Sequence, residues 1–427
     1  MLIVMQLDVS GSQLKFPEVD SLTYHAYLNE DWKTLKQVGT MAIDSGIDYY
    51  YLRMRLGIAY FETLRYRMSV KHFKRALYFN ESSQTAREYL YFAYLYGGIS
   101  YNITERSTYF DSAFLKKMDH ENTFIQSIGF DYTYGINESL QKKFPDGLNG
   151  ITESFAKRPE KYRNIGINIK HRLGNRINIR HGFTKLTKQN LVFSNTGTTP
   201  PTIRYAQVVG QFQYYISPIV FLDDGLHFWL SAHFLNIDIP YRYAFDGSVY
   251  SGENTENDQA FTTGLSKDFS HFNISFGLGY STLNNKQQFS QNIELVYYPL
   301  ANLNLYGLLH IKTQQDGSFV SGPSSIHPGI GFKVFRHAWI EGGYTIGSMD
   351  NYSDINGFYI YNDINPVTKL ATGSLIVPFN KYKTSVFIKY RYLQNNIHVF
   401  SITSDEYVNS GEYQIVHSIT GGLSWIF

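Results

Sequence analysis

The last fifteen residues of the chain alternate between two kinds of side chain. From Tyr413 to Phe427 most odd-numbered positions are apolar or aromatic, and the positions between them are mostly polar or small. Because successive side chains of a β-strand point to opposite sides, this period of two predicts a strand with one apolar and one polar face. Such a strand has to lie between an apolar and a polar environment.

The same period runs through the sequence from about residue 120 onward. Clear ladders occupy residues 124–134, 272–280 and 385–392. Each has about ten residues, the length that a tilted strand needs to cross a bilayer. A soluble sandwich alternates in the same way, with its apolar face turned inward. Charged residues make up only 17% of the chain and aromatic residues as much as 17%, and this composition favours lipid on the apolar face.

We expect about fourteen strands in this part of the chain. They begin near residues 123, 164, 176, 202, 226, 257, 271, 287, 303, 326, 338, 368, 382 and 413. The expected connections are short turns at 173–176, 269–271, 299–302, 335–337 and 378–381, an irregular turn at 217–225, and long loops at 138–163, 188–201, 238–256, 350–367 and 401–412. The sequence lacks the roughly 18 consecutive apolar residues of a membrane-spanning helix, so we expect strands to cross the membrane.

The final strand resembles the closing strand of a bacterial outer-membrane barrel. Gly422, Trp425 and Phe427 have a spacing similar to the C-terminal signal that the barrel-assembly machinery reads. The resemblance implies an antiparallel barrel in the outer membrane of a Gram-negative bacterium. It also implies two partners, outer-membrane lipid and, during biogenesis, the assembly machinery. Barrels of this kind place short turns in the periplasm and long loops outside.

Residues 20–118 show a period of 3.6, which predicts helices. One pair of helices resembles a tetratricopeptide repeat, whose period is about 34 residues. The residues that carry the resemblance are Leu56, Gly57, Tyr60, Phe73 and Ala76. The resemblance implies that the glycine allows a close approach of two helices and that the aromatic side chains fill the space between them. The chain departs from the repeat pattern at Arg53, where an aromatic residue is usual, and at Glu81, where proline is usual.

Together these patterns predict an α plus transmembrane β-barrel protein, a short tetratricopeptide-like helical array followed by an antiparallel barrel of about fourteen strands. We assign residues 1–12 to the remnant of a signal peptide, because they begin with an apolar stretch. Residues 13–120 are assigned to a periplasmic helical domain and residues 121–427 to the barrel.

If the apolar faces meet lipid, the opposite faces line a lumen that is predominantly basic. The expected basic lumen residues are Lys170, Arg172, Arg176, Arg180, Lys312, Lys333, Lys389 and Arg391. The acidic ones are Asp131, Asp268, Glu294 and Glu341. Eight basic against four acidic residues would favour passage of anions. The alternative is a network of ion pairs across the barrel, since buried charges must be paired.

Motifs for catalysis are missing from the sequence: it has no Gly-x-Ser-x-Gly elbow, no His-Glu-x-x-His helix and no phosphate-binding glycine loop. His227, His233 and Ser231 share one face of a strand, which would suit a barrel hydrolase, but we interpret them as lumen residues. We therefore expect no enzyme, no catalytic residue and no cofactor.

Metal and nucleic-acid sites are not expected either. Asp350, Asp354, Asn362 and Asp363 could hold a cation in an outer loop, but the spacing of a calcium loop is missing, so we expect a solvated polar loop. Cysteine is absent, which excludes disulfides and thiolate metal sites. The formal net charge of +2 indicates no nucleic-acid partner.

The combination of periplasmic repeats and a barrel resembles three groups of proteins: surface-lipoprotein assembly modulators, exopolysaccharide exporters and YaiO-like barrels. This resemblance implies an export or assembly component whose helices dock a periplasmic protein client and whose barrel is its passage or platform. One alternative is a conduit for exopolysaccharide or small anions, and another is a plugged scaffold barrel in an outer-membrane complex. Helices that only cap the mouth of the barrel are the structural alternative to docking.

Overall fold

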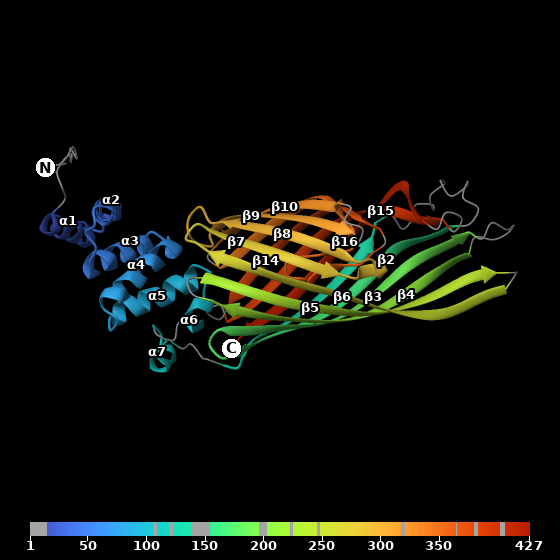
Figure 1. Ribbon diagram of the computed structural model, residues 1–427, viewed down its shortest axis with the longest axis horizontal. Coiled ribbons are helices and arrows are strands. Elements are labelled where there is room, and N and C mark those ends of the chain that lie inside the picture. Colours follow the sequence, from blue (N-terminus) through green and yellow to red (C-terminus); the bar gives the residue numbers. More distant parts are fainter. Residues whose placement is uncertain are drawn as a thin grey trace. The chain divides into compact units, whose positions relative to one another are not determined.

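The computed structural model forms two compact units, one of helices and one of strands (Figure 1). It describes residues 15–105, 109–118, 123–138, 154–195, 203–222, 225–245, 248–316, 321–335, 337–363, 365–379, 383–401 and 406–427. The helical unit ends at Met118 and also includes Tyr298–Leu303, a turn between two strands; the remaining described residues form the second unit. Residues 1–12, assigned above to a signal peptide, lie outside the described residues.

The described part of the helical unit contains seven helices. They are α1 (Phe16–Leu28), α2 (Trp32–Asp44), α3 (Tyr50–Glu62), α4 (Tyr66–Phe79), α5 (Gln84–Tyr96), α6 (Tyr101–Glu105) and α7 (Ser112–Lys117). Side-chain caps begin three of them. Asp31, Ser83 and Asp111 accept hydrogen bonds from backbone N–H groups in the first turns of α2, α5 and α7. Such caps satisfy donors that have no partner within the helix.

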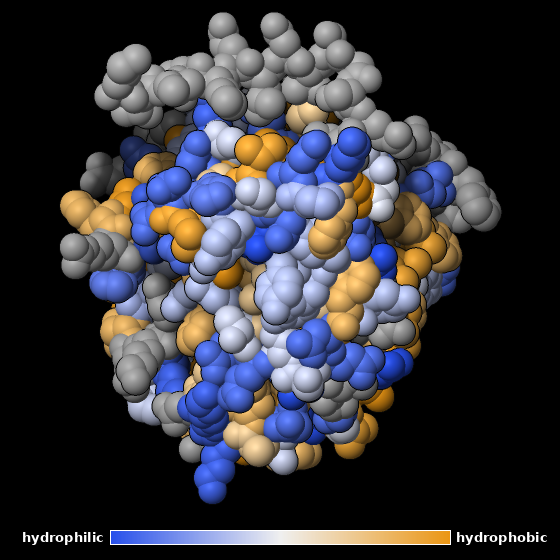
Figure 2. All heavy atoms as spheres, turned by 90° about the vertical axis from the view of Figure 1, so that its left-hand side faces the viewer, coloured by the Kyte–Doolittle hydropathy of each residue, from blue (hydrophilic) through white to orange (hydrophobic). Residues whose placement is uncertain are grey.

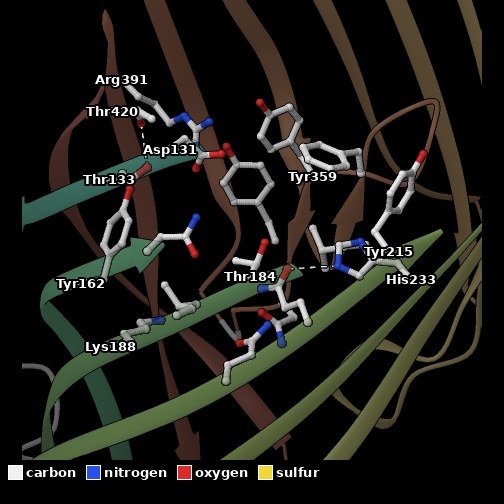
Figure 3. Close-up of a pocket in the computed structure, with 18 of the residues that line it drawn as sticks. Asp131, Thr133, Tyr162, Thr184, Lys188, Tyr215, His233, Tyr359, Arg391 and Thr420 are labelled. Carbon is white, nitrogen blue, oxygen red and sulfur yellow. Dashed lines mark hydrogen bonds between the residues drawn. The ribbon is translucent and has the colours of Figure 1, made fainter. Parts of the chain in front are cut away.

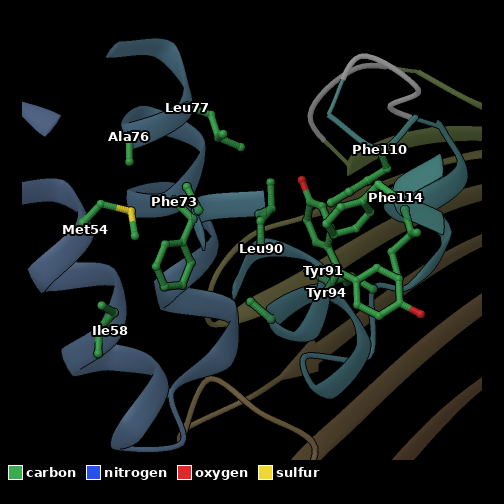
Figure 4. Packing of buried hydrophobic residues seen from close by; sticks show 14 of the residues in the cluster. Met54, Ile58, Phe73, Ala76, Leu77, Leu90, Tyr91, Tyr94, Phe110 and Phe114 are labelled. Atoms are coloured by element: carbon green, nitrogen blue, oxygen red, sulfur yellow. The ribbon is translucent and has the colours of Figure 1, made fainter. Parts of the chain in front are cut away.

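Helices α3 and α4 approach closely at Gly57. A Cβ atom at Gly57 would lie 2.5 Å from the ring of Phe73, so only glycine leaves room for this aromatic side chain. Leu56, Phe73 and Ala76 are completely buried, and Tyr60 stacks on His72 with ring centroids 5.2 Å apart. Figure 4 shows Phe73 of α4 in the cluster of buried residues that α3 and α5 also supply. Gly57, Tyr60, Phe73 and Ala76 therefore lie in or beside the contact of α3 with α4, whereas Leu56 packs in a second cluster with residues of α1 and α2.

An arginine takes the place of the aromatic residue expected at position 53. Arg53 donates to both carboxylate oxygens of Asp48, at 2.6 and 2.9 Å, and Arg75 donates to the same carboxylate at 2.9 Å. The two guanidinium groups hold the pKa of Asp48 below its usual range against the effect of burial. This ion-pair cluster ties the connection after α2 to α3 and α4.

Tyr298–Leu303 joins two strands but makes its contacts within the helical unit. The backbone N–H of Arg67 donates to Ala301 O at 2.9 Å, and its guanidinium lies 4.2 Å from the centre of the Tyr298 ring. The Asn302 amide donates to Leu64 O at 2.7 Å. These contacts make the short turn part of the helical unit.

Fourteen strands of the described residues close into an antiparallel barrel, which confirms the predicted fold class. They are β1 (Ile125–Asn137), β2 (Ser154–Leu173), β3 (Ile177–Asn195), β4 (Ile203–Phe221), β5 (Leu226–Phe245), β6 (Ser248–Asp268), β7 (Phe272–Ser281), β8 (Gln288–Tyr297), β9 (Leu305–Asp316), β10 (Ser321–Val334), β11 (Ala338–Met349), β14 (Val367–Phe379), β15 (Thr384–Ser401) and β16 (Glu406–Ile426). Pairing of β1 with β16 closes the barrel, with Phe130 opposite Leu423.

The outer face of the barrel is apolar. Ile128, Phe130 and Tyr132 of β1 are exposed, as are Ile274 and other alternate residues of the remaining strands, whereas residues between them are mostly serine, threonine, glycine or amide side chains. This distribution matches a barrel that spans a bilayer, where backbone groups are paired in a closed sheet and apolar side chains meet lipid. No helix within the described residues is long and apolar enough to span a membrane.

The three residues of the predicted assembly signal lie on the closing strand. Gly422 pairs with Asp131 of β1 and with Phe387 of β15, and a Cβ atom there would collide with the Phe387 ring. Trp425 and Phe427 are exposed. Recognition by the assembly machinery stays a prediction.

Several strands are longer than their hydrophobic alternation predicts. Within the described residues, the expected loop at 238–256 is an extension of β5 and β6, which pair from Leu226 to Phe245. Residues 251–256 of β6 carry no apolar side chain and Pro240 lies within β5, so the predicted alternation stops while the backbone ladder continues. The irregular turn expected at 217–225 was also placed too early. Pro218 cannot donate to β5, yet Ser217 Oγ bonds Leu230 O at 2.9 Å and β4 continues to Phe221.

His72 makes the stability of the helical unit depend on pH. Burial, with Lys71 and Arg53 close by, lowers its pKa to about 3 from the usual 6.5. Below pH 6.5 the unfolded chain therefore binds a proton that the folded unit excludes. This contribution to the free energy of unfolding is complete above pH 6.5 and is lost as the pH falls.

We expect the helical unit to lose about 1.5 kcal/mol of stability between pH 6.5 and pH 5. Hydrogen exchange of peptides from α3 and α4, corrected for the intrinsic effect of pH, measures this loss. The variant His72→Gln should lack it, and His25→Gln, at an exposed position of α1, should keep it. An unchanged pH dependence in His72→Gln would show that another group is responsible.

Candidate functional site: a hairpin and a cavity inside the barrel

The segment between β11 and β14 folds into the barrel. We call residues 350–363 the inner hairpin; it contains β12 (Tyr352–Ser353) and β13 (Ile360–Tyr361), which pair antiparallel. The sequence predicted a loop outside the barrel at 350–367, and this prediction was wrong. The hairpin is rich in apolar and aromatic side chains, whose transfer from water to the barrel interior is favourable.

Asp354 shapes the tip of the inner hairpin. Its carboxylate accepts hydrogen bonds from the backbone N–H groups of Phe358, at 2.6 Å, and Tyr359, at 3.2 Å. Gly357 has a φ of +69°, a conformation that favours glycine. The tip is therefore a tight, internally bonded turn, and Ile355 within it is buried.

Wall side chains donate hydrogen bonds to the backbone of the inner hairpin. The bonds are Lys312 Nζ to Ser353 O at 2.6 Å, Tyr215 OH to Asn356 O at 3.0 Å and His233 Nδ1 to Gly357 O at 2.8 Å. Lys312 comes from β9, whereas Tyr215 and His233 lie opposite each other on the paired strands β4 and β5, so the donors belong to two parts of the wall. They satisfy backbone carbonyls that the short two-stranded sheet leaves without partners.

Cations of the wall also contact the inner hairpin, mostly through aromatic rings. The distances to ring centres are 3.9 Å for Arg180 and Phe358, 5.4 Å for Lys389 and Tyr359, 5.9 and 5.6 Å for Arg391 and the rings of Tyr359 and Tyr361, and 4.3 Å for Lys312 and Tyr352. Lys188 forms an ion pair with Asp363. A cation over an aromatic face is attracted by about 0.5–2 kcal/mol, so these contacts together help to keep the hairpin in place.

Glycines in the wall make room for the tip of the hairpin. A Cβ atom at Gly277 of β7 would lie 2.9 Å from Ile355, and one at Gly182 of β3 would lie 3.0 Å from Phe358. Both distances are shorter than ordinary van der Waals contact. The wall is therefore shaped to receive these two side chains.

A cavity of about 750 Å³ lies between the inner hairpin and the wall. Figure 3 shows Arg391, Asp131 and Tyr359 around it, with Lys188 and Tyr215 on neighbouring strands. Its lining includes the basic residues Lys157, Lys170, Arg180, Lys188, Lys389 and Arg391, the acidic residues Asp131, Glu256 and Asp363, and many amide, hydroxyl and aromatic side chains. This size and lining suit a polar solute.

The structure brings four of the eight predicted basic residues to the cavity: Lys170, Arg180, Lys389 and Arg391. Lys312 also faces the interior but lies under the inner hairpin. Lys333 stacks on Trp339 at 5.0 Å, at the end of β10. Arg172 and Arg176 lie at and beside the turn between β2 and β3, away from the cavity.

Of the four predicted acidic residues, Asp131 lines the cavity and accepts a hydrogen bond from Asn168 at 3.2 Å. Glu341 accepts from the hydroxyl groups of Tyr306 and Ser374, and Asp268 accepts from Asn273 at the end of β6. Glu294 is half-buried on β8. The bonds described here come from amide and hydroxyl groups rather than from wall cations.

Sequence reasoning missed Lys157, Lys188 and Glu256. All three lie in segments expected to be loops, although they belong to β2, β3 and β6. Lys188 follows Arg180 on β3 by an even number of positions, so the two side chains point to the same face of the strand. A prediction that extended this strand to residue 188 would have placed Lys188 on the inner face. The aromatic residues of the hairpin carried no signal of periodicity that could have assigned them to the lumen.

His233 serves the inner hairpin, because Nδ1 bonds Gly357 O and Nε2 bonds the Gln213 amide at 3.1 Å. Ser231 bonds instead to Thr262, at 2.6 Å, and His227 is half-buried near the start of β5. The arrangement that would suit a hydrolase is therefore not assembled among these residues.

The acidic residues expected in a solvated outer loop lie in the inner hairpin. Asp354 braces the tip, and Asp363 pairs with Lys188, so the expectation of a solvated loop was wrong. The described residues contain no group of three or more histidine, cysteine or acidic side chains that could hold a metal ion.

No family model matches the sequence, and no curated protein matches it. Among solved structures, the chain is similar to the Pseudomonas putida toluene transporter TodX, with 8% identity over 72% of this chain and 90% of that chain and a TM-score of 0.41. A bacterial polysaccharide outer membrane secretin has 8% identity over 72% and 100% of the two chains, with a TM-score of 0.38. The translocator domain of the autotransporter NalP from Neisseria meningitidis has 10% identity over 74% and 92%, with a TM-score of 0.33. Likenesses this distant carry no argument about activity.

The fit between Gly277 and Ile355 predicts how the hairpin can be displaced. Because the chain has no cysteine, Ser353→Cys would place a single thiol at a buried position of the hairpin. We expect Gly277→Val to displace Ile355 and to speed labelling of this thiol by a water-soluble maleimide at least several-fold.

The matched control is Gly210→Val, since a Cβ atom at Gly210 has open space around it. It should leave the labelling rate unchanged. Equal labelling rates in Gly277→Val and the parent would mean that the wall glycines do not hold the hairpin.

Proposed function

We propose that the protein is an outer-membrane conduit that its inner hairpin closes. The observation that carries this proposal is the set of contacts by which separate parts of the wall hold the hairpin across the lumen. Lys312, Tyr215 and His233 bond its backbone, and Gly277 and Gly182 fit its side chains. Side chains that merely filled space would not need so many directed bonds.

The outer membrane is the proposed location because closed antiparallel barrels with an apolar exterior occur in that bilayer. The short turns, such as the one between β2 and β3, would then face the periplasm together with the helical unit. The basic lining of the cavity supports passage of anionic rather than cationic solutes.

The proposal predicts that removing the inner hairpin opens the barrel. We expect single-channel conductance in planar bilayers to be low for the parent protein and to rise several-fold when residues 352–361 are replaced by a short Gly-Ser linker. Circular dichroism and resistance to unfolding by detergent at room temperature would check that the barrel is intact.

Gly277→Val provides a second route to the same state without a deletion, and Gly210→Val is its control. If an intact barrel without residues 352–361 conducts no more than the parent, the conduit proposal is wrong, and a scaffold function becomes the better explanation.

Docking of a periplasmic protein by the helical unit is a second candidate function. It is favoured by aromatic side chains that the helices leave exposed, among them Tyr51 at 64% and Tyr78 at 70%. The face in Figure 2 is mostly hydrophilic with scattered apolar residues, which suits a transient rather than a permanent partner.

A photo-reactive phenylalanine at Tyr51 or Tyr78 should cross-link to a discrete periplasmic protein in living cells. The same residue at Lys33, at an exposed position of α2, should give no such adduct. Identical patterns at the three positions would contradict docking at these aromatic residues.

A further inference from the structure

The basic residues of the lumen meet the inner hairpin mainly through aromatic rings. Arg180 lies over Phe358, Lys389 over Tyr359, and Arg391 near both Tyr359 and Tyr361. Lys188 pairs with a carboxylate, and that carboxylate belongs to the hairpin as well. These four basic residues of the wall are thus covered by the inner hairpin.

We propose that Arg180, Lys188, Lys389 and Arg391 form the binding site of an anionic, hydroxyl-bearing solute, the chemistry of an acidic oligosaccharide, and that the inner hairpin occupies this site in the closed barrel. This assignment rests on the proposed conduit function and names its solute. The solute would open the barrel by taking the place of the hairpin.

The anionic character follows from the strength of the competing interactions. A guanidinium binds a carboxylate in a bidentate, charge-assisted manner, which is stronger and more directional than its attraction to an aromatic face. Three of the four site residues hold the hairpin by the weaker kind of contact. An anion that reaches Arg180 or Arg391 therefore replaces a weak partner with a strong one.

The hydroxyl-bearing character follows from the rest of the cavity. Asn164, Gln211 and Gln213 line it, together with Thr133 and Thr420. Amide and hydroxyl groups both donate and accept hydrogen bonds, which matches the hydroxyl groups of a sugar. The cavity of about 750 Å³ would accommodate a short segment of a saccharide before the hairpin moves, and a longer one afterwards.

Binding and opening are coupled because solute and hairpin use the same cations. A ligand shifts an equilibrium between two states only when it binds one of them better. An anion at Lys389 and Arg391 excludes Tyr359 from these residues, so it binds the open state better than the closed one. A neutral sugar offers the cations uncharged hydroxyl acceptors but no charge-assisted hydrogen bond, so we expect it not to displace the rings and not to open the barrel.

The test uses the full-length protein in planar bilayers with three probes. They are an oligogalacturonate of six residues, maltohexaose as the neutral sugar of equal length, and acetate as a carboxylate without hydroxyl groups. At equal carboxylate concentration, we expect oligogalacturonate to raise the open probability of the parent protein several-fold, acetate to have a much smaller effect because it has a single charge and no hydroxyl group, and maltohexaose to leave the open probability near its basal value.

Variants at the site give a second readout. Lys389→Gln with Arg391→Gln should raise the basal conductance, because the hairpin loses two contacts, and should increase the half-effective concentration of oligogalacturonate at least tenfold. The control Lys333→Gln changes a basic residue that stacks on Trp339 and lies outside the cavity lining, and both values should stay at those of the parent.

The protein without residues 352–361 separates this inference from the conduit proposal. If it conducts and oligogalacturonate interrupts its current, the site binds the probe once vacated, as expected. If it conducts but the current is not interrupted, or if maltohexaose or acetate acts as well as oligogalacturonate, the assignment of the solute is overturned and the conduit stands. If it does not conduct, the conduit itself is refuted.

Discussion

The pairing of backbone groups is the constraint on which the structure of the barrel depends. In hydrocarbon an unpaired N–H or C=O group costs several kcal/mol, so a sheet in a bilayer cannot keep a free edge. The pairing of β1 with β16 removes the last two edges. Closure creates an enclosed lumen. The polar side chains that face this lumen then need hydrogen-bond or charge partners inside it. The inner hairpin supplies such partners to Lys312, Arg180 and Lys188.

The inner hairpin therefore has two effects that are usually treated separately. It satisfies charges that the wall carries, and it obstructs the space that those charges surround. Rings over Arg180 and Lys389 do not neutralise charge as carboxylates would. In the proposed conduit, an electrostatic preference for anions would therefore persist while the barrel is closed, whereas a network of carboxylate pairs across the barrel would remove it.

Much of the fold could be predicted from sequence, because a barrel in lipid imposes a period of two that few other structures share. The strand at 272–280 matched β7 because apolar side chains there meet lipid at every second position. The extension of β5 and β6 escaped prediction because residues 251–256 of β6 carry no apolar side chain and Pro240 lies within β5. Lys188 was missed as well, whereas Arg180, nearer the apolar part of β3, was found.

The site was only partly predictable, because the hairpin is held by residues from many strands and its own sequence has no periodicity. Arg53 in the helical unit shows another limit: the ion pair with Asp48 replaces the aromatic contact that the repeat pattern expects.

The pairing of β1 with β16 also constrains how the molecule folds. Thr133 and Thr420 share a hydrogen bond of 2.8 Å across a sequence separation of 287 residues, and contacts between such distant residues form slowly. The inner hairpin precedes β14, β15 and β16 in the chain. It can reach its position against Gly182 and Gly277 while the nascent sheet is still an open, curved surface. The hairpin then does not have to enter a closed barrel. The pairing of the last strand encloses an interior in which the hairpin is already in place.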